Sequence, residues 1–273
     1  MKDKISLAGD LGSGKSTVSD ILIRELGAEY YSTGAIVRSI AERRGMTVVE
    51  LNVYMETHPE IDNEIDDGLV RLGEVDKLLV IDSRMAWHFT PDTFKVYLST
   101  DIETSALRIM SANRRGEHAA TLEETVESTR ARRESEKKRY REQYGVDIKD
   151  LANYALIVDT TAATPDEVAE CIMAGFAKWQ GDRGYRRAFI TPERLNFPDT
   201  PADPERVSEL SAKIERGESV PEVTVTERDG EFYLTGGLES AMAYSFNMST
   251  FIPATLTGDS VPKCEYVRMK NSI

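Results

Sequence analysis

Short apolar runs alternate with longer segments of helical spacing along the first 160 residues of the chain. The apolar runs predict buried strands at 4–8, 77–82, 94–99 and 154–160. The helical segments lie at 34–45, 59–73, 101–113 and 121–143, and another helix follows residue 15, where Val18, Ile21, Leu22 and Leu26 share one face. Such alternation predicts an α/β fold, with a parallel sheet flanked by helices on both faces.

The pattern changes near residue 180, where "WQGDRGYRRAF" combines two glycines with several charges and is expected to be a linker. Beyond it the sequence predicts a helix closed by Gly217, a hairpin turning at Asp229-Gly230, another helix and a closing strand. We therefore expect two domains, 1–180 and 186–273. The second is a small α+β unit of roughly 90 residues, large enough to fold alone. We also expect residues 1–180 to fold and bind ATP by themselves.

Composition narrows the choice of partners. The 273 residues carry a formal charge of −13, so the overall field does not attract nucleic acid, and a contact with DNA would need a local basic patch such as 129–144. No apolar run approaches the roughly 20 residues that span a bilayer. The N-terminus lacks a signal-peptide profile, and the two cysteines, Cys171 and Cys264, lie far apart. We expect a cytoplasmic protein without a membrane segment.

The segment "GDLGSGKS" matches the phosphate-binding loop pattern G-x-x-x-x-G-K-[ST], and it stands between a predicted strand and a predicted helix as that motif requires. Backbone N–H groups and the helix N-terminus would hold phosphate oxygens. Lys15 would bridge the β- and γ-phosphates, and Ser16 would ligate Mg²⁺. The residues expected to bind ATP are Gly9, Gly12, Ser13, Gly14, Lys15, Ser16 and Thr17.

A second set of motifs resembles the archaeal type of cytidylate kinase. It comprises "YYSTGAIVRSIAERRGM", "ELNVYMETHPEIDNEIDD" and "RESEKKRYREQYGVDIKDLANYALIVDTT", and the similarity covers roughly residues 4–178. That family consists of P-loop nucleoside monophosphate kinases with an arginine-rich helical lid. The resemblance implies Mg-ATP as the donor and a pyrimidine nucleotide, CMP or dCMP, as the acceptor.

The resemblance also implies roles for individual residues. Ser32, Thr33 and Arg38 match the acceptor-binding segment, and Arg84 matches an arginine that contacts the acceptor phosphate. Arg114 falls in the lid and is expected to bind ATP. The remaining matches are Arg132 and Arg139, which would close on the phosphates, and Glu136, an acidic position near the base. Mobile arginines suit phosphoryl transfer, which depends on positioning and charge neutralisation.

Two aspartates depart from the family pattern. Asp10 replaces an uncharged loop residue, and Asp82 ends a strand where a glutamate–glycine pair is common. Asp82 suits a magnesium partner, together with Ser16, or a general base. Asp10 would orient or deprotonate a hydroxyl acceptor, or only face the lid arginines, because an acceptor phosphate needs no base. Our candidate catalytic residues are Lys15, Asp10, Asp82, Arg132 and Arg139.

The tail, from "ITPERLNF" to "STFIPATL", more weakly resembles the partition-protein/sulfiredoxin type of domain. That family's phosphate-binding box carries basic residues, whereas the matching stretch here, "TGGLESAMA", has none. A structural or substrate-presenting role is the better interpretation of the tail.

Three hypotheses follow. The first is ATP- and Mg²⁺-dependent phosphorylation of a pyrimidine nucleotide. The second is a kinase for a hydroxyl acceptor, such as a hydroxymethylpyrimidine in a nucleotide or in DNA, which the two aspartates and the tail motivate. The third is a binding protein that ATP switches.

Overall fold

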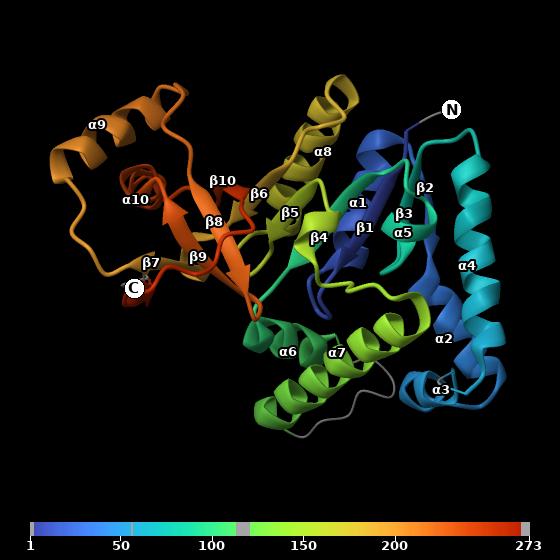
Figure 1. Cartoon of the computed structure of the whole chain (residues 1–273). Coiled ribbons are helices and arrows are strands. Elements are labelled where there is room, and N and C mark those ends of the chain that lie inside the picture. The colour runs from blue at the N-terminus through green and yellow to red at the C-terminus, as the bar shows by residue number, and fades with distance from the viewer. Residues whose placement is uncertain (1–2, 56, 113–120, 269–273) are drawn as a thin grey trace.

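The computed structural model describes residues 3–55, 57–112 and 121–268, and within them the strands form one sheet of 11 (Figure 1). Its order is β11-β7-β9-β8-β10-β6-β5-β4-β1-β3-β2. The first half of the chain supplies a parallel set, β1 (Ile5–Gly9), β2 (Glu29–Ser32), β3 (Leu79–Asp82), β4 (Phe94–Ser99) and β5 (Leu156–Asp159). The expected α/β fold with a parallel sheet is confirmed.

The helices of this half follow the predicted pattern. They are α1 (Lys15–Leu26), α2 (Thr33–Arg43), α3 (Val48–Met55), α4 (Pro59–Glu74), α5 (Ala86–Phe89), α6 (Ile102–Ser111), α7 (Leu122–Tyr144) and α8 (Pro165–Gly181). The sequence did not predict β2, α3 or α5. α7 and α8 begin at side-chain caps: Thr121 and Thr164 each form a reciprocal capping box with the glutamate three positions on.

Alternation along the strands divides the core into two faces. Ile5, Leu7 and Val96 point toward α1 and α8, where they pack with Leu22 and Ile172. The intervening residues point to the opposite face, and there the core is shared with the tail: Ala8, Tyr97 and Ile157 pack in one cluster with Ile190 and Ile252. One sheet therefore has a different cover on each face.

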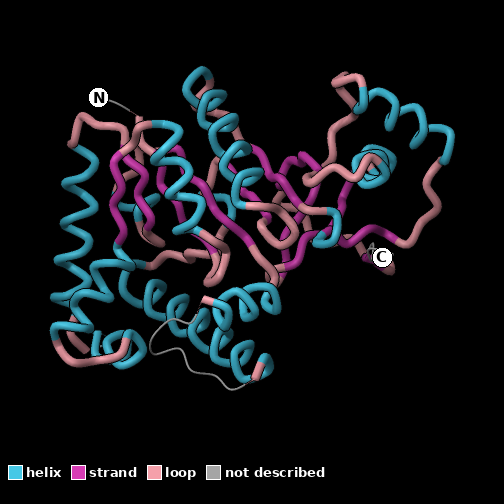
Figure 2. Tube along the Cα trace, turned by 180° about the vertical axis from the view of Figure 1, so that it is seen from behind, coloured by secondary structure: helices cyan, strands magenta, loops and turns pink. Residues whose placement is uncertain are grey.

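The tail continues the sheet across its edge (Figure 2). It contains β6 (Arg187–Ile190), β7 (Leu195–Pro198), α9 (Pro204–Glu215), β8 (Thr224–Arg228), β9 (Glu231–Gly236), α10 (Leu238–Phe246), β10 (Ile252–Leu256) and β11 (Tyr266–Arg268). β6 pairs in parallel with β5, and β10 pairs antiparallel with β6. Asp229 and Gly230 both have positive φ, which confirms the predicted hairpin turn. The division at residues 180–186 thus falls in the connection between α8 and β6, and two separate folding units remain a proposal.

We predict that residues 1–180 expressed alone are less stable than the whole chain. Removing the tail leaves β5 as an open edge and uncovers apolar side chains, among them Tyr97 and Ile157. The fragment should unfold at a lower denaturant concentration and bind a hydrophobic dye. Unfolding at the midpoint of the whole chain, without dye binding, would contradict this.

Candidate active site

The loop between β1 and α1 is shaped for anion binding. A Cβ on Gly9 would lie 2.4 Å from the carbonyl oxygen of Leu98, and one on Gly12 would lie 2.6 Å from that of Ser105, so both positions require glycine. Gly14, the N-cap of α1, has φ 82° and no side-chain cap, and the first turn of α1 holds no acidic residue. The helix N-terminus is therefore open to phosphate oxygens, and the loop fits ATP.

Lys15 reaches back over this loop. Its Nζ donates to the main-chain oxygens of Gly9 at 3.0 Å and Asp10 at 2.7 Å. Burial and, to a smaller extent, the neighbouring Arg84 lower the pKa of Lys15 to about 8, against the opposing effect of Asp82. A bound phosphate would replace the carbonyl partners and favour the charged ammonium.

A cleft of about 1270 Å³, its open mouth included, brings most of the expected residues together. It is lined by Gly12, Ser13, Gly14, Lys15, Ser16, Thr17, Thr33, Arg38, Asp82, Arg84, Arg132, Glu136 and Arg139. Gly9, Asp10 and Ser32 do not line it, and Arg114 lies outside the described residues. The phosphate loop, the start of α2 (the expected acceptor-binding segment) and α7 (the expected lid helix, hereafter the lid helix) thus face one space.

Two of the three arginines expected at the phosphates, Arg84 and Arg132, converge on one carboxylate. Arg84 Nε lies 2.6 Å from Glu136 Oε2, and Arg132 Nε lies 3.3 Å from Glu136 Oε1. Burial alone would raise the pKa of Glu136, but Arg84, Arg132 and Arg139 together bring it below its ordinary value. Glu136 therefore acts as an internal counter-ion for these arginines.

Arg139 joins the lid helix α7 to α3. Its Nη1 donates to Asn52 Oδ1 at 3.4 Å, and its Nη2 donates to Tyr140 Oη at 3.3 Å. Val37, Val48 and Asn52 also line the cleft, and sequence reasoning missed all three. The apolar spacing Val48–Leu51–Met55 was the available signal for α3.

Ser16 and Asp82 line the same cleft, and Asp82 ends β3 with its Oδ2 accepting a 3.1 Å hydrogen bond from Tyr30. Within residues 3–55, 57–112 and 121–268, no group of three or more His, Cys, Asp or Glu side chains could hold a metal. One hydroxyl and one carboxylate nevertheless fit Mg²⁺, which takes few protein ligands and binds substrate phosphates and water.

Ser32 is buried at the start of α2, where its side chain accepts from the backbone N–H of Ala35 at 3.2 Å. As the N-cap it fixes the beginning of this helix. Its neighbour Thr33 is the residue that reaches the cleft.

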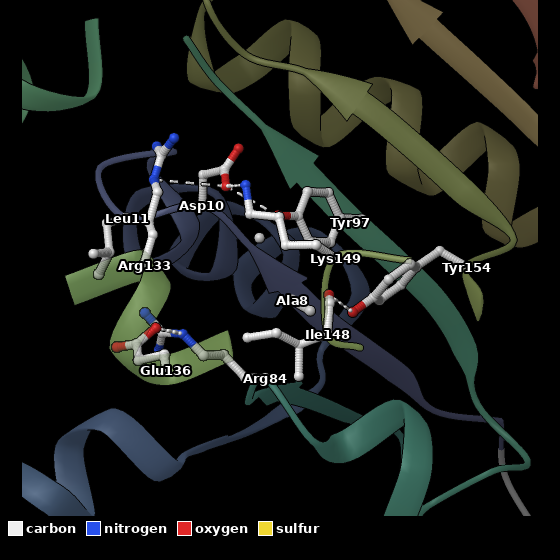
Figure 3. A pocket seen from close by; sticks show the side chains of 11 residues that line it. Ala8, Asp10, Leu11, Arg84, Tyr97, Arg133, Glu136, Ile148, Lys149 and Tyr154 are labelled. Carbon is white, nitrogen blue, oxygen red and sulfur yellow. Dashed lines mark hydrogen bonds and ion pairs between the residues drawn. The ribbon is translucent and has the colours of Figure 1, made fainter. Parts of the chain in front are cut away.

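Asp10 does not line the cleft but lies in a small neighbouring pocket with Arg133 and Lys149 (Figure 3). Only 5% exposed, it accepts from Tyr97 Oη at 3.0 Å and from the backbone N–H of Thr100 at 3.1 Å. It forms an ion pair with Lys149, and Arg133 Nε lies 3.9 Å from its Oδ1. Burial would raise the pKa of Asp10, but Lys149 and Arg133 bring it below the ordinary value. Sequence reasoning did not single out Lys149 or Arg133.

We predict that ATP affinity falls as pH rises above about 8. Below that pH Lys15 is already charged, whereas above it each binding event must take up a proton, so the dissociation constant rises up to about tenfold per pH unit. Calorimetry between pH 7.5 and 9.5 measures this. Lys15→Arg is the control, because a guanidinium stays charged. A flat wild-type profile would contradict the assignment.

The comparisons with known proteins concern the first two thirds of the chain. The sequence model of the cytidylate kinase-like family matches residues 4–162. The cytidylate kinase of Sulfurisphaera tokodaii is 34% identical over 172 residues, which are 62% of this chain and 93% of that protein. That of Thermoplasma volcanium is 36% identical over 174 residues, 62% of this chain and 89% of its own length.

A third relative is longer. The S-adenosylmethionine-dependent nucleotide dehydratase of Lacinutrix mariniflava is 36% identical over 179 residues, which are 65% of this chain but 37% of that protein. Among solved structures, the shikimate kinase of Bacteroides thetaiotaomicron superposes with a TM-score of 0.46 at 14% identity, covering 63% of this chain and 97% of its own. No helix in the described part of the chain has the length and apolar character to cross a membrane.

Proposed function

We propose that the chain, which belongs to the cytidylate kinase-like family, transfers the γ-phosphoryl group of Mg-ATP to a pyrimidine nucleotide, CMP or dCMP. It is an ATP-dependent kinase of the P-loop class. The observation that carries the proposed acceptor is that the phosphate loop lines the same cleft as Thr33, Arg38 and Arg84. Relatives that are cytidylate kinases support the same acceptor.

The proposed chemistry assigns positioning and charge neutralisation to this chain's side chains. The α1 N-terminus and Lys15 would hold the β- and γ-phosphates, and Ser16 and Asp82 would hold Mg²⁺. When bound, Mg²⁺ neutralises the charge of the phosphates. Arg132 and Arg139 would exchange protein partners for phosphate oxygens as charge develops there.

Base recognition would involve α2 and α3. Val37 and Val48 supply apolar surface in the cleft, and the amide of Asn52 supplies both a donor and an acceptor. That combination suits a flat heterocycle with polar edges. A phosphate acceptor is ionised near neutral pH, so this reaction requires no carboxylate base.

The direct test incubates the protein with labelled ATP and a panel of nucleoside monophosphates, 5-hydroxymethylpyrimidine nucleotides and DNA. We expect the γ-phosphoryl label of ATP to be recovered as the β-phosphate of CDP or dCDP. Label on a hydroxymethyl group or in DNA would contradict the proposal and favour a hydroxyl acceptor.

Lys15→Ala should remain folded and lose at least about a hundredfold in phosphoryl transfer.

A second prediction concerns the acceptor side of the cleft. Arg38→Ala should raise the KM for the nucleotide acceptor about tenfold or more, with the KM for ATP unchanged, because one charge-assisted contact to the acceptor phosphate is lost. Arg43→Ala on the same helix is the matched control, since Arg43 does not line the cleft and bonds to Ser39 O. Equal effects of the two changes, or an increase in the KM for ATP alone, would contradict the assignment.

A further inference from the structure

Asp10 connects the phosphate loop to two other parts of the chain, the end of β4 and the segment at Lys149. Its carboxylate is bound by Tyr97 on β4, by the backbone N–H of Thr100, and by Lys149, which lies 139 residues away. Meanwhile its main-chain oxygen accepts from Lys15. The residue thus has its backbone at the phosphate site and its carboxylate under the lid helix α7.

The lid helix presents different residues to these two places. Arg132 lines the cleft and Arg133 points to Asp10, while Glu136 lines both the cleft and the small pocket that holds the Asp10 carboxylate (Figure 3). The side chain of Arg133 is 16% exposed, and its Nε and Nη2 are buried without a hydrogen-bond partner. A buried guanidinium that lacks partners is costly, so this ion pair is incomplete as it stands.

The segment after the lid helix adds a second connection. Asp147 pairs with Arg141 at 2.7 Å and Lys137 at 3.5 Å, both on α7. Its Oδ1 accepts from the backbone N–H of Lys149 at 2.9 Å, and the Lys149 side chain reaches Asp10. The base of the helix is thereby joined to the phosphate loop, while Arg133, two turns earlier, is held less tightly.

We propose that Asp10 is a positioning residue for the lid helix: when Arg132 and Arg139 engage bound phosphates, Arg133 completes a hydrogen bond to Asp10. This proposal depends on the phosphoryl transfer proposed above. An ordinary charge-assisted N–H···O distance is about 2.7–2.9 Å, so a movement of about 1 Å from the observed 3.9 Å suffices. Lys149 keeps the carboxylate charged and aimed at α7.

The first experiment replaces Arg133, since Asp10→Asn leaves Lys149 unpaired and risks misfolding. Arg133→Met should lower kcat about ten- to a hundredfold, the value of a hydrogen bond to a charged group, with the ATP dissociation constant unchanged. Arg133→Lys should retain part of the kcat that Arg133→Met loses. Lys138→Met is the matched control, because Lys138 is 75% exposed on the same helix and pairs with Glu142 at 3.8 Å. A kcat for Arg133→Met equal to that of Lys138→Met would overturn the proposal.

A double-mutant cycle tests the pairing itself. If Arg133 acts through Asp10, Asp10→Asn combined with Arg133→Met should cost no more in kcat than the more severe single change. Additive losses in folded proteins would refute the pairing.

Hydrogen exchange separates this idea from the identity of the acceptor. A non-hydrolysable ATP analogue should protect the amides of α7 in the wild type and in Lys138→Met, but protect only the phosphate loop in Arg133→Met. Equal protection of α7 in all three would overturn the proposal. The hydrogen-exchange experiment contains no acceptor. A failure of the nucleotide panel would therefore refute the proposed function, while the hydrogen-exchange result would still decide the role of Asp10.

Discussion

The cations that line the cleft repel one another when no phosphate is bound, and the fold must compensate them. Glu136 lies between Arg84 and Arg132, Asp82 lies near Lys15, and two main-chain carbonyls accept from the Lys15 ammonium. Each partner occupies a donor that a phosphate oxygen would otherwise take. Phosphate oxygens would replace these protein partners on binding. The free-energy cost of removing the cations from water is therefore already offset in the folded protein before the substrate binds.

Asp10 obeys the same constraint from the other side of the loop. A carboxylate beside bound phosphates would be repelled, but this one is turned into a buried site with two cations and two neutral donors. Its negative charge therefore stabilises the cations around the loop, and it also favours the charged form of Lys15 in the cleft. Phosphate loop, lid helix and the segment at Lys149 become parts of a single electrostatic arrangement.

Sequence reasoning found the elements whose cause is local. Gly9, Gly14 and Lys15 identified the phosphate loop, and the long helices had clear periodicity. β2 was missed because its residues "EYYS" are mostly exposed and form no apolar run. α3 has only eight, mostly apolar residues. Its apolar spacing is therefore too short to distinguish a helix from a strand.

The remaining features depend on contacts across long stretches of chain. No spacing pairs Asp10 with Lys149, because the connection exists only once β4, α7 and the loop have come together. Likewise, the tail reads as a separate unit from its own pattern. The tail continues the sheet because β6 pairs with β5. The four residues of β6 have little periodic signal of their own.

This continuation has a consequence for synthesis on the ribosome. β6 emerges soon after β5 and can pair with it, but its outer edge waits for β10, which begins at Ile252, about 60 residues after Ile190. At about 5–20 residues per second that interval lasts roughly 3–12 s. For that time the nascent protein carries an unpaired strand beside an apolar face. The molecule therefore passes through a stage in which a chaperone, or a second nascent copy, meets a surface that the finished fold conceals.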